Sequence, residues 1–274
     1  MAYADDGELT SDTSLLHFYG EDLKRRREEA GLKQTKFAAE ALIAPSLLSK
    51  IESGKRLPSK ELSVLADARF GTGDHFQRLW PLVIKYAYPS WFRPFVELEA
   101  TARAIRSFQV QVVPGLLQTQ EYARAVLEAG RLDPDRVEEL LAARVVRQDI
   151  LTRENPPELW VVLDETVLRR PMGSSEVFAG QLQRLLEATE SARTVLQVIP
   201  FSAGGHAGNN GAFSALAMDE GPDVVYVDGL LQGQIHADPA EVRAATRIYT
   251  LLQAGALSPA ASLDLIRTVM KDHR

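Results

Sequence analysis

The sequence contains no cysteine. This absence excludes disulfide bonds, thiolate zinc sites, iron–sulfur clusters and a cysteine nucleophile. No apolar run approaches the ~18 residues of a membrane-spanning helix. The opening stretch "MAYADDGELTSDTSLL" has neither the basic flank nor the apolar core of a signal peptide. Together these absences predict a cytoplasmic protein.

Histidine is also scarce, with five residues in the chain. In the C-terminal part, His206 and His236 are the only histidines before the tail residue His273, and neither has a metal-ligand spacing to Asp or Glu. No nucleophile–base set is visible. We therefore expect no metal, no cofactor and no enzymatic activity.

Charge is unevenly distributed along this acidic chain, whose formal net charge is -6. Between Gly20 and Glu61 ten bases face seven acids, so this segment is +3 and the remainder is -9. Contact with nucleic acid needs a local basic surface and not a basic chain. The segment is thus a candidate nucleic-acid interface, and the acidic remainder has another role.

The spacing of apolar residues divides the chain into an all-α domain followed by an α+β domain with a mixed sheet. We expect a flexible tail over 1–19, a helix-turn-helix domain over 20–71 and the α+β domain over 76–274. In the second domain we predict strands within 105–114, 158–164, 194–200, 212–219, 223–229 and 231–238. The helices predicted there cover 118–130, 133–153, 175–190, 239–254 and 259–271.

The pattern of the basic segment predicts a series of short helices. The first ends at Gly31, the second covers residues 34–41, and the third opens at Pro45, where a missing N–H costs nothing. On the third helix Leu48 and Ile51 share a face and should point to the core. The other faces carry Ser46, Leu47, Ser49 and Lys50, and Lys55 and Arg56 follow the end of the helix at Gly54. This is the pattern of a helix that reads bases in the major groove, with a basic clamp on phosphate.

The stretches "REEAGLKQTKFA" and "SKIESGKRLPS" resemble the phage-repressor (Xre-type) helix-turn-helix family. In that family an arginine of the first helix pairs with the glutamate ending the recognition helix, which implies a structural strut between Arg27 and Glu52. We expect DNA contacts from Gln34, Thr35, Pro45, Ser46, Leu47, Ser49, Lys50, Lys55 and Arg56. The chain departs from the family at Leu42, where glycine is usual, and at Ala44, where Ser or Thr often caps the helix.

Several motifs of the second domain resemble a family of large actinobacterial regulators with an antitoxin-like domain of unknown function, to which WhiJ-like regulators belong. The motifs include "VPGLLQTQEYARAVLEAG", "ILTRENPPELWVVLDETVLRRPMG" and "VIPFSAGGHAGNNGAFSAL". The resemblance implies a regulator, most simply a repressor, whose C-terminal domain binds itself and a small acidic BldB-like protein encoded by an adjacent gene. Such a regulator reads DNA as a homodimer, because two-fold proteins read paired half-sites.

Two segments leave a small-molecule sensor open as the alternative. "FSAGGHAGNNG" (201–211) could cradle an anion around His206, or it could simply be a glycine-rich loop between strands. "LDETVLRR" (163–170) could grip an acidic partner through Arg169 and Arg170, or its charges could cap a short helix. In the sensor alternative these two segments form the ligand pocket.

Overall fold

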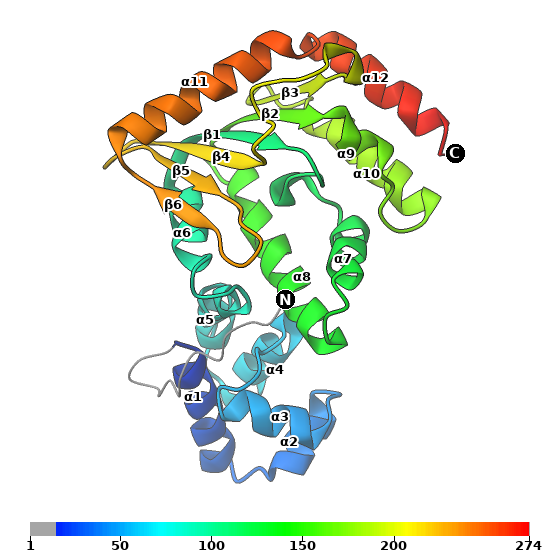
Figure 1. The fold of residues 1–274 in the computed structure, drawn as a ribbon. Coiled ribbons are helices and arrows are strands. Elements are labelled where there is room, and N and C mark those ends of the chain that lie inside the picture. Colours follow the sequence, from blue (N-terminus) through cyan, green and yellow to red (C-terminus); the bar gives the residue numbers. More distant parts are fainter. Residues whose placement is uncertain (1–14, 274) are drawn as a thin grey trace. The chain divides into compact units, whose positions relative to one another are not determined.

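A computed structural model describes residues 15–273 of the chain. It contains two compact units, the first ending at Ser90 and the second beginning at Trp91 (Figure 1). The boundary therefore lies beyond the expected residues 71–76. Phe76 and Val83 are fully buried among the apolar side chains of the first unit, and this packing assigns the segment up to residue 90 to that unit.

The N-terminal unit is entirely helical. Its elements are α1 (Leu15–Glu29), α2 (Gln34–Glu40), α3 (Pro45–Glu52), α4 (Lys60–Phe70), α5 (His75–Val83) and the 3-10 turn η1 (Ile84–Ala87). Residues 15–19, which the sequence assigned to the flexible tail, are the first turns of α1. The reason is that Leu16, Tyr19 and Leu23 recur at helical spacing and pack on the core. The rest of that expected tail, 1–14, lies outside the described residues.

Helix α1 crosses the end of α3 in direct backbone contact at Gly20. A Cβ atom at this position would lie 2.4 Å from the carbonyl oxygen of Ile51 and 2.9 Å from that of Glu52. Only a glycine permits this approach. Tyr19 and Leu23 of α1 and Leu48 of α3 belong to one buried apolar cluster, which holds α3 on the bundle.

The C-terminal unit has a six-stranded mixed sheet with helices on both faces. Its strands are β1 (Ala102–Gln109), β2 (Glu158–Asp164), β3 (Thr194–Ile199), β4 (Phe213–Met218), β5 (Val224–Val227) and β6 (Gln234–His236). Its helices are α6 (Arg93–Thr101), α7 (Gln120–Ala129), α8 (Pro134–Gln148), α9 (Glu165–Arg169), α10 (Ser175–Ala188), α11 (Pro239–Gly255) and α12 (Pro259–Lys271). Three 3-10 turns complete it: η2 (Gly115–Leu117), η3 (Asp149–Leu151) and η4 (Phe201–Ala203).

The order of the strands is β3-β2-β1-β4-β5-β6. β1, β2 and β3 run parallel, and helices α7 to α10 make the crossovers between them. β4 pairs antiparallel with β1, and β5 and β6 follow as antiparallel neighbours. The unit thus joins a βαβαβ half, which needs crossover helices, to a meander that needs only short loops.

Side chains alternate between the two faces of this sheet, as the strand period requires. On β5, Val224 and Tyr226 join one core cluster with helices α10 and α12, whereas Val225 joins the other with Tyr249 and Leu252 of α11. Figure 1 shows α11 lying along one face and α8 on the opposite side of the sheet. Both faces of the central strands are therefore buried.

All six predicted strands are present, but the first of them ends earlier than predicted. β1 ends at Gln109 and not near Pro114, because residues 110–114 leave the sheet to form a loop. Helix α7 ends at Ala129 and Gly130 follows it as the C-cap, as predicted. Gly130 has a φ of -75°, and the next residue, Arg131, takes a positive φ of 52°.

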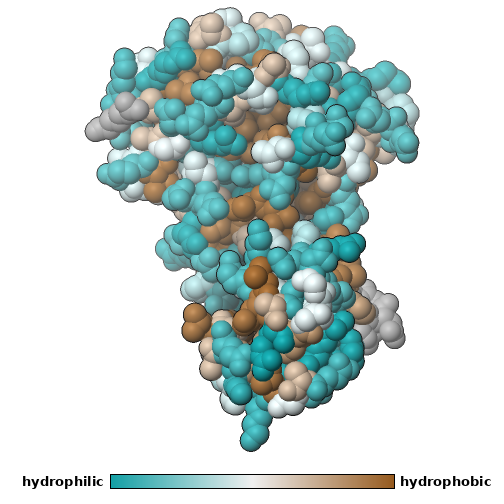
Figure 2. Space-filling view, turned by 180° about the vertical axis from the view of Figure 1, so that it is seen from behind, coloured by the Kyte–Doolittle hydropathy of each residue, from teal (hydrophilic) through white to brown (hydrophobic). Residues whose placement is uncertain are grey.

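Hydrophilic side chains cover much of the surface in the view of Figure 2, with hydrophobic patches between them. None of the helices within residues 15–273 is long and apolar enough to cross a membrane.

Candidate nucleic-acid interface

A buried ion pair connects the first helix to the end of the third. Arg27 donates from Nε to Oε1 of Glu52 over 2.6 Å and from Nη2 to Oε2 over 3.0 Å. Its Nη1 donates to the Leu32 carbonyl oxygen over 2.7 Å. Both residues are buried, with exposed fractions of 6% for Arg27 and 4% for Glu52. The hydrogen bonds to Glu52 hold the pKa of Arg27 above its usual value, so the guanidinium stays protonated.

Gln34 is part of the same network. Its side-chain amide donates to Oε2 of Glu52 over 2.9 Å, so the carboxylate binds a residue at the start of α2 as well as α1. Gln34 is half-buried, and its neighbour Thr35 is exposed. The start of α2 is therefore held in a fixed position relative to α3, with Thr35 directed to solvent.

The turn between α2 and α3 is tight and strained at one residue. Leu42 has a φ of 55°, a conformation that glycine adopts without penalty but that is unfavourable for a residue with a Cβ atom. The side chain of Leu42 is 93% exposed. Ala44 precedes α3 with no side-chain hydrogen bond to the helix. Pro45 occupies the first turn, as expected. Both departures from the family pattern are thus real features of the turn geometry.

Helix α3 has a core face and a solvent face. Leu48 is fully buried and Ile51 is 2% exposed, which confirms the prediction for both. Pro45, Ser46, Ser49 and Lys50 are exposed. Leu47 differs from its expected orientation, since it is partly buried and packs on the apolar core. The outward face therefore presents hydroxyl and ammonium groups, with Leu47 at its margin.

A glycine turn follows α3 and orients two basic residues. Gly54 has a φ of 67°, and a Cβ atom there would lie 2.7 Å from the ring of His17. The backbone amides of Lys55 and Arg56 both donate to the carbonyl oxygen of Lys50, over 2.8 and 3.2 Å. Lys55 is exposed and Arg56 is half-buried. The turn thus sets Lys55 and Arg56 next to the last turn of the helix.

The structure also locates the residues singled out in the C-terminal unit. His206 is bound to its surroundings on both ring nitrogens: Nδ1 accepts from the Gly208 amide over 3.1 Å, and Nε2 lies 3.2 Å from Oδ2 of Asp164. Its ring packs edge-on against Phe108. Asp164 in turn caps α9 through the Thr166 amide. His206 thereby connects the glycine-rich loop to the start of α9.

The structure brings the segment that carries Arg169 and Arg170 against the glycine-rich loop of His206, through contacts of Asp164 and Glu165. Arg169 pairs with Glu165 one turn earlier on α9, and the other oxygen of that buried carboxylate accepts from the Phe201 amide over 2.8 Å. Arg170 follows α9 and is exposed. Glu165 lies in the first turn of α9 and Arg169 in its last turn. An acid at the start and a base at the end of a helix interact favourably with the helix dipole.

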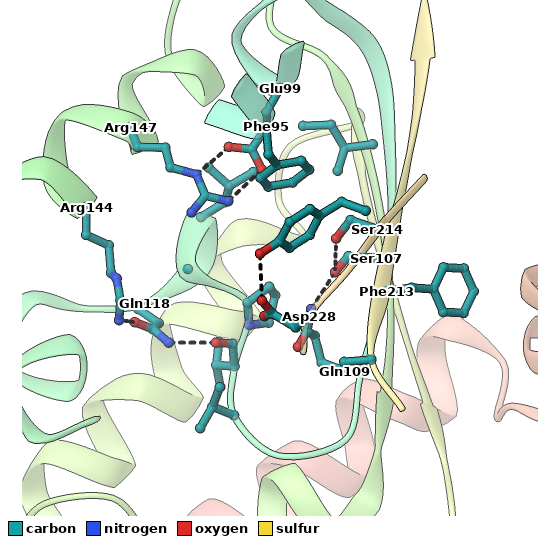
Figure 3. A pocket seen from close by; sticks show the side chains of 18 of the residues that line it. Phe95, Glu99, Ser107, Gln109, Gln118, Arg144, Arg147, Phe213, Ser214 and Asp228 are labelled. Carbon is teal, nitrogen blue, oxygen red and sulfur yellow. Dashed lines mark hydrogen bonds and ion pairs between the residues drawn. The ribbon is translucent and has the colours of Figure 1, made fainter. Parts of the chain in front are cut away.

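Sequence reasoning missed a cavity elsewhere in the C-terminal unit, lined by segments far apart in the chain. Its wall includes Glu99 of α6, Ser107 of β1, Arg144 and Arg147 of α8, and Tyr226 of β5 (Figure 3). No short motif joins these positions. The available signal was polar residues at inward positions of otherwise apolar elements, as at Ser107 in β1.

Two sequence models match the chain, and together they cover most of it. The helix-turn-helix model matches residues 23–72, and the model described as a domain of unknown function (DUF5753) matches residues 92–268. No curated protein and no solved structure matches the chain.

Proposed function

This chain belongs to the DUF5753 family and carries a helix-turn-helix domain, and we propose that it acts as a repressor. The helix-turn-helix domain makes the protein a DNA-binding transcriptional regulator. The finer proposal is that the segment Pro45–Ser53 enters the major groove of an operator. In this proposal the protein is cytoplasmic and represses transcription by occupying the operator. It catalyses no reaction.

The observation that supports this proposal is the division of α3 into two faces. Leu48, Ile51 and Glu52 hold the helix to the bundle, while Ser46, Ser49 and Lys50 remain exposed. With its side chains an α-helix such as α3 is about 10–12 Å in diameter, which fits the major groove of about 12 Å. Hydroxyl and ammonium groups donate to base-edge acceptors or to phosphate.

The residue roles can be separated by binding measurements on operator and random duplexes. We expect Lys55→Ala to weaken both duplexes equally and to reduce the salt dependence of log K by about 0.9, the loss of one phosphate contact. Ser49→Ala and Lys50→Ala should weaken the operator more than random DNA. Lys271→Ala is the matched control, because it removes an exposed lysine of the other unit. Equal loss with Lys271→Ala would contradict the assignment.

The start of α2 supplies a second group of proposed contacts. Thr35 is exposed, and Gln34 is oriented by its hydrogen bond to Glu52. We propose that both bind the DNA backbone beside the groove. Thr35→Val should weaken operator and random DNA to a similar extent, because a phosphate contact carries no sequence information.

Self-association is the next element of the proposal. One such module contacts a single half-site, and two-fold dimers read half-sites about one helical turn apart. We expect light scattering to give a homodimer and operator mapping to give a two-fold repeat. A monomer binding one half-site with full affinity would overturn this element.

Control by a small acidic partner protein from an adjacent gene, of the BldB or antitoxin-partner kind, completes the proposal. The acidic remainder of the chain does not favour DNA, and this supports a role in binding something else. The WhiJ-like actinobacterial resemblance suggests such a partner. Co-expression with the adjacent small gene should give a complex that is lost when residues 91–274 are deleted.

The second candidate function is a one-component small-molecule sensor. The observation favouring it is the cavity next to Arg144 and Arg147, at a place different from the segments 201–211 and 163–170 first considered. In this candidate a ligand in the C-terminal unit changes operator affinity. Operator binding measured with and without ligand distinguishes it from control by a protein partner.

A further inference from the structure

The cavity of the C-terminal unit lies on the side of the sheet that faces α6 and α8. It has a volume of about 170 Å³. An apolar cavity of about 150 Å³ is known to hold benzene. The space is therefore sufficient for one six-membered ring with a short substituent.

Aromatic side chains form one wall of this cavity. Phe95 stacks on Tyr226 with ring centroids 4.2 Å apart, and Phe92 meets Tyr226 edge-on at 5.5 Å. Phe95 and Tyr226 are both buried. A planar aromatic body can add to such a group by offset or edge-to-face packing, beyond the gain from buried area.

Hydroxyl and amide groups form the strand side of the cavity. Ser107 of β1 accepts a hydrogen bond from Gln109 over 3.0 Å and another from Ser214 of β4 over 3.3 Å (Figure 3). Ser107 is 3% exposed. Its two hydrogen bonds offset the free-energy cost of burying the hydroxyl, so this side of the cavity is polar.

Two arginines define the charged side of the cavity. Arg144 and Arg147 lie three residues apart on α8 and so share one face of the helix. Arg147 pairs with Glu99, which is 2% exposed, and Arg144 donates to Gln118 over 2.7 Å. Two cations thus face one buried carboxylate. The fourth charge of the lining, Asp228, is exposed and accepts from the Tyr226 hydroxyl over 2.7 Å.

The loop between β1 and α7 passes close to both guanidinium groups. A Cβ atom at Gly115 would lie 3.6 Å from Nη1 of Arg147 and 4.0 Å from Nε of Arg144. Gln148 of α8 donates to the carbonyl oxygens of Gly115 and Gln118 over 2.7 and 2.9 Å. The positions of the two arginines are therefore coupled to the conformation of this loop.

We propose that this cavity binds a small aromatic carboxylate, with its ring against Phe95 and Tyr226 and its carboxylate at Arg144 and Arg147. Arginine matches carboxylate geometry and gives charge-assisted hydrogen bonds. This inference rests on the second candidate function and names the ligand class of its site.

Phenylacetate is a suitable probe, and phenylacetamide is its neutral counterpart of the same shape. Calorimetry on the full chain without DNA should show saturable binding of phenylacetate and about tenfold weaker binding of phenylacetamide, the difference expected from a charge-assisted bond. Arg144→Met should remove this preference for the acid. Ser107→Leu should abolish binding of both compounds by filling the cavity.

Arg136→Met is the control, because Arg136 lies on α8 outside the cavity lining and pairs with Glu139. It should retain wild-type affinity, and thermal unfolding of each variant checks that it folds. Absence of phenylacetate binding to the folded wild-type chain would overturn the proposal, as would equal affinities for acid and amide. Binding that leaves operator affinity unchanged would retain the ligand site and refute the sensor function alone.

Discussion

Removing the charge of Arg27 tests how the recognition helix is held. Glu52 is 4% exposed and accepts two hydrogen bonds from Arg27 and one from Gln34. Arg27→Met keeps much of the side-chain volume but leaves the carboxylate buried beside Gln34 alone. Breaking one partner of a buried ion pair costs about 3–5 kcal/mol, a large part of the ~5–15 kcal/mol that stabilises a domain.

The double variant Arg27→Met/Glu52→Leu should recover most of this loss. Apolar residues of similar size often replace a buried ion pair at little or no cost in stability. We therefore expect strong coupling between the two positions, with the double variant more stable than Arg27→Met. Operator affinity should still fall in the double variant, because Gln34 loses the acceptor that orients it.

Amide hydrogen exchange on the full chain measures this effect for the N-terminal unit alone. Peptides from α1 and α3 report the opening free energy of that unit, while peptides from β1 and β2 serve as an internal control. A loss below about 1 kcal/mol in Arg27→Met, or a double variant whose loss is the sum of the two single losses, would refute the reasoning.

Three further predictions concern the same unit. Leu42→Gly should raise its free energy of unfolding by about 1 kcal/mol by relieving the positive φ, measured by hydrogen exchange, whereas Leu42→Ala should give no gain. Gly20→Ala should destabilise the unit by 2 kcal/mol or more, on the order expected for overpacking against a backbone; an unchanged melting temperature would contradict the close approach. Asp67 provides a test of pH dependence: burial by itself raises its pKa, but hydrogen bonds from Thr72 and from the amides of Phe76 and Gln77 outweigh burial and leave the pKa lowered. A group with a lowered pKa stabilises the fold at pH values above its ordinary pKa near 4, and this contribution is lost as the pH falls through the native pKa. Acid unfolding should therefore begin below about pH 4. Asp67→Asn should weaken this dependence on pH.

Much of the fold could be read from the sequence, because the patterns involved are local. The spacing of three and four residues between Leu16, Tyr19 and Leu23 reflects burial of one helix face, and the alternation in β5 reflects burial of both sheet faces. The loop geometry was less predictable. Residues 110–114 alternate as a strand would, yet they leave the sheet and form part of the cavity wall.

The candidate interface was predictable where it depends on local helical spacing, and less so where it depends on contacts between distant residues. Leu48 and Ile51 point to the core because helical spacing requires a shared face. The same spacing placed Leu47 on the outer face. In the structure Leu47 packs against the apolar cluster of the N-terminal unit, which extends beyond the face of Leu48 and Ile51. The hydrogen bond between Gln34 and Glu52 joins residues 18 positions apart, a distance at which no local pattern operates.

By itself the sequence determined the helix-turn-helix segment, the strands of the second unit and the separation of basic from acidic charge, since each depends on residues close together in the chain. The tertiary structure alone decided that residues 76–90 belong with the N-terminal unit, that His206 connects a loop to the start of α9 and that Glu99, Ser107, Arg144 and Tyr226 surround one cavity. The physical reason is that these relations depend on the packing of segments tens of residues apart. The geometry of that packing is set by the whole core and not by any one stretch of it.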